Sequence, residues 1–430
     1  MDQVFFLERM HRAIMPSTGC TEPVAIALNT ATARANAKGK VMRLTVTLDN
    51  YLYKNAMGVG LPGAAARGVA LCAAMGVTAG DAQAQMRVLD HVTDEALHAA
   101  KQMLFDGLGT VNTREDVHGR LVESVLETDE DTVRVLTLQN HTNIVRIDHA
   151  PFEPYMEAQG DEALASDPIR ACKLKDMVEF ADNVPVEKLR FLQDGIDMNM
   201  AIAQKGLTFG LGRAVRTLID EGAIGDSPVA RAEMLCAAAS YARMSGVSMP
   251  VMTATGSGNQ GITLLLTIEG VAQFLHIDEE KKLRAAALAN LVNIYVKTFT
   301  GTLSAVCACG VASGLGASVG VVYMLGGGEE QMLFAMQNIL GSICGMICDG
   351  AKEGCANKVQ LSSGLAVKSA FLAMNGMNVR GGNGIVGGEL FTLFENLGQL
   401  VHEGMEGTNS VIVRIMSKGS KTCSSVYVIE

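Results

Sequence analysis

Five of the ten cysteines in this 430-residue chain lie close together, between Cys307 and Cys355. They form a Cys-x-Cys pair, Cys307 and Cys309, and part of a segment that runs from Cys344 to Lys358. Thiolate-rich clusters select zinc or iron–sulfur centres, although these spacings match neither paired zinc knuckles nor the ferredoxin pattern. Buried, inert thiols are the alternative. The clustering favours a metal site. Inert thiols are instead expected at the scattered cysteines, which are Cys72, Cys172, Cys236 and Cys423.

A further cysteine stands in the segment Pro16–Pro23, which reads Pro-Ser-Thr-Gly-Cys-Thr-Glu-Pro and precedes an apolar, helix-like run over 24–33. Backbone N–H groups at a helix start bind anions. The same position lowers a cysteine's pKa and so favours the thiolate that metals need. Cys20 is therefore a candidate ligand. A capping loop that happens to contain a cysteine is the alternative.

The segment 253–261 is a second polar loop, with the sequence Thr-Ala-Thr-Gly-Ser-Gly-Asn-Gln-Gly, and it opens an apolar run over 262–268. A carboxylate or phosphate would fit against its backbone amides. It lacks the lysine of a Walker loop and the βαβ context of a dinucleotide fingerprint, and an ordinary flexible turn is the alternative. The eight histidines form no HExxH-like pair and no GxSxG elbow occurs, so zinc and serine hydrolases are not supported.

The composition limits the classes of function. The formal net charge is −10, so a basic face for nucleic acid is not expected. Residues 1–15 carry both charges and no long apolar core, which is unlike a secretory signal. Ten cysteines without such a signal indicate reduced thiols and a cytoplasmic protein. The helical C-terminal half is apolar and rich in small residues, which is compatible with a homo-oligomer.

One apolar run raises the question of a membrane span. Lys297 is the only charged residue between Arg284 and Glu329, and residues 305–325 would pass a crude hydropathy window. However, this run contains cysteines and serines and is broken repeatedly by glycine. We therefore predict a buried helix in a large core, and no membrane partner.

The apolar pattern predicts a mixed α/β region in the N-terminal third of the chain. We expect helices over 2–15 and 63–75, a strand over 41–49, and antiparallel meander strands over 120–127, 132–138 and 143–147. The proline-containing segment 149–168 is the best linker candidate.

Beyond that segment the apolar spacing becomes helical. Helices are expected over 186–203, 229–242, 279–296, 329–347 and 361–374. No proline follows Pro250, so long helices can run unbroken. The predicted fold class is α+β. It has an N-terminal mixed α/β domain with a small antiparallel sheet, 1–165, followed by a mostly α-helical domain, 166–430.

Several of these segments resemble the L-cysteine desulfidase family, which is related to the α chain of the iron–sulfur L-serine dehydratases. The resemblance runs over nearly the whole chain, and the strings STGCTEP and CDGAK are its specific motifs. It is carried by Ser17–Pro23, Lys54–Asn55 with Leu61–Gly63, Ala308–Gly310 and Cys348–Lys352.

A more distant similarity is to the serine dehydratases themselves. Thr253–Gly261 resembles their TAPTNGA-like loop, and three cluster cysteines resemble Cys307 or Cys309, Cys348 and Cys355. The interval from Cys348 to Cys355 is shorter than theirs. Where they have an SSSHT-like loop with a histidine, this chain has Cys20, which favours the desulfidase side.

The resemblance implies a [4Fe–4S] cluster held by Cys20, Cys309 and Cys348, with Cys355 next and Cys307 as the alternate. Three thiolates leave one iron open to act as a Lewis acid on the leaving group. The implied reaction is α,β-elimination of L-cysteine to hydrogen sulfide, pyruvate and ammonia, without pyridoxal phosphate. L-serine dehydratase is the alternative within this class, and a non-catalytic metal-binding protein is the alternative outside it.

The remaining candidates are polar residues of the same segments. Donors to the carboxylate of a small amino-acid substrate are expected at Ser17, Thr18, Ser257 and Asn259. Residues that orient groups or move protons are expected at Lys54, Asn55, Asp349 and Lys352. A solvated surface role is the alternative for each of these four. The general base stays unassigned, because that choice needs geometry.

Overall fold

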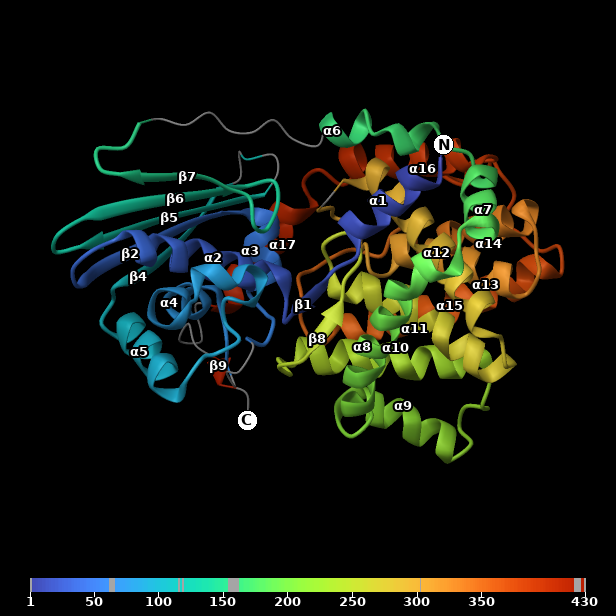
Figure 1. Ribbon diagram of the computed structural model, residues 1–430, viewed down its shortest axis with the longest axis horizontal. Helices are drawn as coiled ribbons and strands as arrows, with labels where there is room; N and C mark the ends of the chain where they lie inside the picture. The colour runs from blue at the N-terminus through green and yellow to red at the C-terminus, as the bar shows by residue number, and fades with distance from the viewer. Residues whose placement is uncertain are drawn as a thin grey trace.

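The structure is a computed structural model, and it describes residues 2–61, 66–114, 117, 120–153, 162–301, 303–420 and 427–428. Figure 1 shows two parts side by side, one built on a β-sheet and the other made of packed helices. This is the predicted α+β class. The division at residue 165 stays a prediction, because residues 154–161 of the linker candidate lie outside the described residues, as do Pro62, Gly63 and Cys423.

The sheet has five strands in the order β4-β2-β5-β6-β7. They are β2 (Val41–Asp49), β4 (Gly109–Arg114), β5 (Leu121–Thr128), β6 (Thr132–Leu138) and β7 (Ile144–His149). The meander β5-β6-β7 is antiparallel, as predicted. The sheet is nevertheless mixed, because β4 pairs in parallel with β2 at the edge. The sequence does not predict β4, since Gly-Thr-Val-Asn-Thr-Arg has one apolar residue and no alternation.

Helices pack against this sheet and bury its apolar face. Leu44, Val46 and Leu48 alternate along β2 as predicted, and all three are buried in one core with α2 (Thr21–Asn36) and α4 (Val69–Ala79). The helix predicted from residue 63 begins only at Val69, because Ala66–Arg67 form strand β3. Two further helices belong to this part, α3 (Asn50–Ala56) and α5 (Asp94–Phe105).

The helical part contains every helix predicted beyond the linker. Its main helices are α7 (Leu174–Asn183), α8 (Arg190–Gly206), α9 (Gly210–Asp220), α10 (Pro228–Met244), α11 (Gly258–Leu275), α12 (Glu279–Thr300), α13 (Val311–Met324), α14 (Glu329–Ile343), α15 (Cys355–Met374) and α16 (Leu390–Gln399). Helix α15 begins at Cys355, ahead of the prediction, so a predicted ligand lies in its first turn.

The membrane-like run folds as the predicted buried helix. It forms α13, which is buried along almost its whole length. The glycines that interrupt the run allow close packing on α12. A Cβ at Gly316 would lie 2.3 Å from the Ala289 carbonyl oxygen. Among the described helices, none combines the length and the apolar character needed to cross a membrane.

Each end of the chain packs against the part of the molecule that is formed mainly by the other half of the sequence. Helix α1 (Gln3–Ala13) packs into the core of the helical part through Phe6 and Met10, whereas α17 (Thr408–Ser420) packs against α3 of the sheet part. Strand β1 (Pro16–Thr18) pairs with β8 (Pro250–Met252). Segments that are distant in sequence therefore meet where the two parts touch.

Candidate active site

The segment that contains Cys20 is held between the two parts. Strand β1 pairs with β8, so Ser17 lies opposite Val251. Helix α2 begins directly after Cys20, ahead of the helix-like run predicted over 24–33. Arg243 of α10 is only 2% exposed and donates from Nη2 to the Gly19 carbonyl at 2.9 Å. The Cys20 thiol is thereby fixed at the start of a buried helix.

The glycine-rich loop, 253–257, lies beside this segment and leads into α11. It is shorter than the predicted 253–261, because residues 258–261 form the first turn of that helix. Thr255 has φ +46°, a left-handed conformation that is strained for a β-branched residue. Its hydroxyl donates to Gln260 at 2.8 Å and accepts from Asn293 at 3.2 Å. The Thr21 hydroxyl donates to a carbonyl of the same loop at 3.1 Å. These bonds hold the strained loop against α11, α12 and α2.

The two cysteine-bearing segments of the helical part pair with each other. The backbone N–H of Cys307 and that of Cys348 each donate to the opposite segment, at 2.8 and 2.7 Å. This antiparallel pairing brings the Cys-x-Cys pair beside Cys348. The Cys309 thiol lies 3.5 Å from the Ser257 hydroxyl, which connects the pair to the glycine-rich loop.

These segments surround a cavity of about 90 Å³, which we call the thiol cavity. Five thiols line it, and they belong to Cys20, Cys307, Cys309, Cys348 and Cys355. The predicted ligands and the alternate are therefore brought together from both parts of the molecule. Within the described ranges, the remaining cysteines do not line this cavity.

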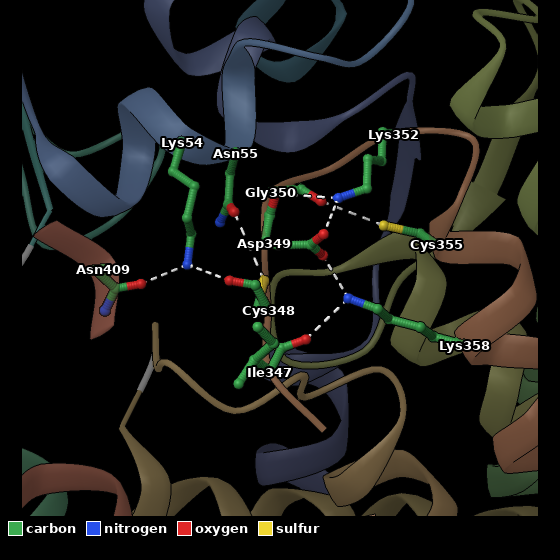
Figure 2. A network of polar contacts seen from close by, with 10 residues as sticks. All are labelled: Lys54, Asn55, Ile347, Cys348, Asp349, Gly350, Lys352, Cys355, Lys358 and Asn409. Atoms are coloured by element: carbon green, nitrogen blue, oxygen red, sulfur yellow. Dashed lines mark hydrogen bonds and ion pairs between the residues drawn. The ribbon is translucent and has the colours of Figure 1, made fainter. Parts of the chain in front are cut away.

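Figure 2 shows how the loop that carries Cys348 is braced. Lys54 is fully buried, and its Nζ donates to the Cys348 carbonyl at 2.6 Å and to Asn409 Oδ1. Burial lowers the pKa of Lys54, and the nearby Cys348 and Asp349 oppose this in part. Gly350 has φ +94°, and a Cβ there would lie 2.4 Å from the Lys54 carbonyl, so only glycine fits.

The same loop carries a carboxylate between two cations. Asp349 forms ion pairs with Lys352 and Lys358. Lys358 also donates to the Ile347 carbonyl at 2.8 Å. Burial alone would raise the pKa of Asp349, but the two ammonium groups lower it to about 2. Asp349 is therefore ionised and locks the loop to α15.

The four residues predicted to orient groups or move protons occupy different places. Asn55 lines the thiol cavity, and its Oδ1 lies 3.8 Å from the Cys348 thiol. Lys54, Asp349 and Lys352 are not among the described residues that line it. A solvated surface role is wrong for Lys54 and Asn55, which are buried, whereas the side chains of Asp349 and Lys352 are each 37% exposed.

The predicted carboxylate donors are divided between two cavities. Ser257 and Asn259 line the thiol cavity. Ser17 lines a neighbouring cavity of about 450 Å³, which we call the second chamber. Thr18, in β1, is not among the described residues that line either cavity.

Three charged residues of the thiol cavity were not predicted from the sequence. Glu22, Arg120 and Arg243 line it, and each is more than nine-tenths buried. Arg243 donates from Nη1 to Asn259 Oδ1 at 3.3 Å, so it connects the glycine-rich loop with the Cys20 segment. A charge inside a run of mostly apolar and small residues is the signal that could have identified Arg243, whereas Glu22 stands in the polar STGCTEP string itself.

Burial is the largest influence on the pKa of three cavity thiols, Cys20, Cys348 and Cys355. It raises the pKa of Cys20 well above its ordinary value, and Arg243 opposes this only in part. The prediction that the helix start lowers the pKa of Cys20 is therefore wrong, because loss of solvent disfavours the thiolate more strongly. Burial also raises the pKa of Cys348, and it raises that of Cys355 to about 12. These thiols keep their protons unless a metal replaces them.

Glu22 is the carboxylate residue among the described residues that line the thiol cavity. Its Oε2 accepts from the Cys20 thiol at 3.1 Å and from the Thr21 hydroxyl at 3.0 Å. Burial alone would raise the pKa of Glu22, but the neighbouring His141 and Arg120 and the hydrogen bond from the Cys20 thiol lower it below its ordinary value. Glu22 is therefore ionised at neutral pH and can accept a proton.

The donor set suits a polynuclear cluster better than a single metal ion. In the ranges that the structure describes, no three His, Cys, Asp or Glu side chains converge closely enough to hold one ion. The five thiols are instead spread around one cavity. Iron–sulfur clusters bind thiolates at several different irons, so thiols around a common space match what such a cluster needs.

Comparison with known proteins identifies one matching family and relatives that cover nearly the whole chain. The family described as serine dehydratase alpha chain matches residues 59–414. Three relatives carry the name "UPF0597 protein". The one from Clostridium tetani (strain Massachusetts / E88) is 34% identical over 413 residues, 95% of this chain and 97% of the relative. The one from Desulfatibacillum aliphaticivorans is 35% identical, covering 94% and 95%. The one from Alkaliphilus metalliredigens (strain QYMF) is 36% identical, covering 96% and 94%.

Proposed function

Because the chain belongs to the serine dehydratase alpha chain family, we propose that it is an iron–sulfur lyase that degrades L-cysteine to hydrogen sulfide, pyruvate and ammonia. The observation that carries the proposal is the thiol cavity. Five cysteines from distant parts of the chain line one small space, together with an ionised carboxylate and hydrogen-bonding side chains. This combination supplies ligands, a proton acceptor and orienting groups in one place.

The proposed ligands are Cys20, Cys309 and Cys348, with Cys355 next and Cys307 as the alternate to Cys309. When bound, a [4Fe–4S] cluster with one open iron supplies a Lewis acid toward the sulfur of the substrate. The hydrogen bonds that hold the cysteine-bearing loops in place suit the binding of such a cluster. Ligands keep their positions only if surrounding hydrogen bonds hold them, and Lys54 and Arg243 hold the two loops that carry Cys348 and Cys20.

In the proposed reaction, Glu22 accepts the Cα proton of L-cysteine at its carboxylate. The Cβ–S bond breaks, and its electron pair leaves with the sulfur as hydrosulfide. The remaining 2-aminoacrylate tautomerises to the imine, which one water molecule hydrolyses to pyruvate and ammonia. Ser257 and Asn259 line the same cavity and would orient the polar groups of the substrate.

L-cysteine is proposed in preference to L-serine because of Cys20. The STGCTEP string resembles the desulfidases, whereas the serine dehydratases have a histidine-containing loop at this place. In this chain the Cys20 thiol lines the cavity at this place and donates a hydrogen bond to Glu22. L-serine dehydratase, which the family description itself suggests, is the second candidate.

An anaerobic assay of the iron-reconstituted protein tests both candidates. Pyruvate and sulfide would be measured with L-cysteine and, separately, pyruvate with L-serine, while the visible spectrum is recorded. Equal amounts of sulfide and pyruvate from a brown protein would support the proposal. Pyruvate from L-serine alone would make the protein a serine dehydratase. A brown but inactive protein would indicate a non-catalytic metal-binding protein, and a colourless one would contradict the cluster.

A further inference from the structure

The second chamber, lined by Ser17, His141 and Lys297 among others, lies directly beside the thiol cavity. The two cavities share Arg120, Thr255 and Gly256 as their common wall. A molecule in the second chamber therefore lies next to the thiols with only this wall between them. The function proposed above leaves the second chamber unused.

The charges in the second chamber are mostly positive. Lys297 and Arg120 line it and are each 5% exposed, and both also contact other protein groups. Asp167 is the acidic residue among the described lining residues, and it is paired with Arg9 at 2.5 Å. On the far side of the shared wall, Glu22 faces Arg120 across a short distance and lowers the excess charge there. Lys297 and Arg120 are therefore the buried cationic side chains among the described residues that line the second chamber.

Two residues that line the same space each carry an uncharged polar atom without a protein partner. Ser17 Oγ, on a residue that is 5% exposed, and His141 Nε2 are both buried and make no hydrogen bond. Both residues line the second chamber. Burial, followed by the charge of Arg120, lowers the pKa of His141 from 6.5 to about 3, so its ring is neutral at physiological pH. Buried polar atoms are normally paired, so these two point to a polar ligand.

We propose that the second chamber binds the carboxylate of a small amino acid, with Lys297 and Arg120 as its cationic partners and the Ser17 hydroxyl as a hydrogen-bond donor. The identity of the amino acid as substrate rests on the proposed function, whereas carboxylate binding does not. A carboxylate held here lies next to the wall that the second chamber shares with the thiol cavity. Lys297, the single charge in a long uncharged run, then has a chemical reason to be buried.

The test is equilibrium binding of L-alanine, which has the carboxylate and ammonium groups but no leaving group. L-alaninamide, which lacks the carboxylate, is the matched probe. Titration calorimetry on the protein with and without reconstituted iron should show that L-alanine binds more tightly than L-alaninamide by about tenfold or more, as expected for charge-assisted hydrogen bonds. Equal binding of the two probes would overturn the proposal.

Variants assign the effect to the second chamber. Lys297→Gln should reduce the preference for L-alanine to near unity, whereas Lys297→Arg should retain most of it. Arg12→Gln is the control, because Arg12 lines the mouth of the second chamber but its side chain is 76% exposed. It removes the same charge and should change affinity by less than about threefold, since solvent screens it. Equal losses in Lys297→Gln and Arg12→Gln would contradict a specific site.

Ser17→Ala covers the case in which Lys297→Gln does not fold. The Ser17 hydroxyl has no partner in the protein, so its removal breaks no internal hydrogen bond. We expect L-alanine to bind about tenfold more weakly to this variant, and unchanged affinity would remove Ser17 from the site. The result is separable from the proposed function, because L-alanine binding requires neither a cluster nor turnover.

Discussion

The thiol cavity and the second chamber share a wall but are built in opposite ways. The thiol cavity is small, about 90 Å³, and the loops around it are tied to each other and to Lys54 and Arg243. The second chamber is larger, about 450 Å³, and two polar atoms in its wall, Ser17 Oγ and His141 Nε2, have no protein partner.

This difference matches two kinds of occupant. A resident inorganic group needs ligands that stay in place, so the loops that carry them must be braced by other groups. A small molecule that enters and leaves needs room, together with polar atoms that become paired only when it binds. The proposed division has a cluster in the thiol cavity and a substrate carboxylate in the second chamber. This division explains why the loops of the thiol cavity are held by other groups and why two polar atoms of the second chamber have no protein partner.

The largest effect is expected from removing a thiol. Cys348→Ser should abolish both the visible cluster absorbance and the release of pyruvate, because an alcohol oxygen is a poor substitute for a thiolate ligand. Cys344→Ser is the matched control, since Cys344 is a neighbouring, partly buried cysteine that does not line the thiol cavity. Absorbance and turnover that survive in Cys348→Ser would remove this residue from the site.

The next effect concerns the carboxylate of the thiol cavity. Glu22→Gln keeps the shape and the hydrogen-bonding ability of the side chain but removes its ability to accept a proton. Turnover should fall by a factor of about 100 or more, while cluster absorbance and L-alanine affinity stay near the parent values. If turnover is retained, Glu22 is not the base. If the cluster is lost, its role is to position Cys20.

A stability effect is expected at the brace of the thiol cavity. Lys54→Met leaves the Cys348 carbonyl and Asn409 Oδ1 without their buried donor. This should lower the free energy of unfolding by about 2–3 kcal/mol, measured as a lower urea midpoint. Lys352→Met is the comparison, because its pair with Asp349 is partly exposed and should contribute less than about 1 kcal/mol. Equal midpoints for the two variants would show that the buried brace is unimportant.

The smallest effect on the free energy of unfolding at neutral pH is expected from replacing His141, which lines the second chamber. Between pH 6.5 and about 3, the unfolded chain binds a proton at His141 that the folded protein does not. The free energy of unfolding therefore falls as pH decreases through this window, by about 2 kcal/mol from this residue at pH 5. His141→Gln should differ little from the parent at pH 7.5 and lose less stability between pH 7 and 5. The free energy of unfolding would be measured by urea titration at each pH. If it changes equally with pH in the variant and the parent, the neutral, buried ring is contradicted.

Local pattern explains which parts of the fold could be predicted. Strand β2, the meander and the long helices follow from apolar periodicity, which neighbouring residues alone establish. Strand β4 could not be predicted, because its only support is its pairing with β2 at the sheet edge. The start of α4 was misplaced for a similar reason, since β3 forms through a partner that is distant in sequence.

The sequence by itself determined the kinds of chemical group in this protein. The clustered cysteines, the STGCTEP string and the family resemblance pointed to the five thiols that line the cavity, although the cluster also contains Cys344, which does not line it. The lone charge at Lys297 was also visible as a departure from an apolar run.

Only the tertiary structure decided how those groups are arranged and what state they are in. It placed Ser17 in the second chamber, away from Ser257, and it buried Glu22 and Arg243 beside Cys20. It also raised the pKa of Cys20, against the local expectation. Burial and proximity depend on residues hundreds of positions away. Desolvation and charge pairing therefore arise only when the two parts of the chain pack together.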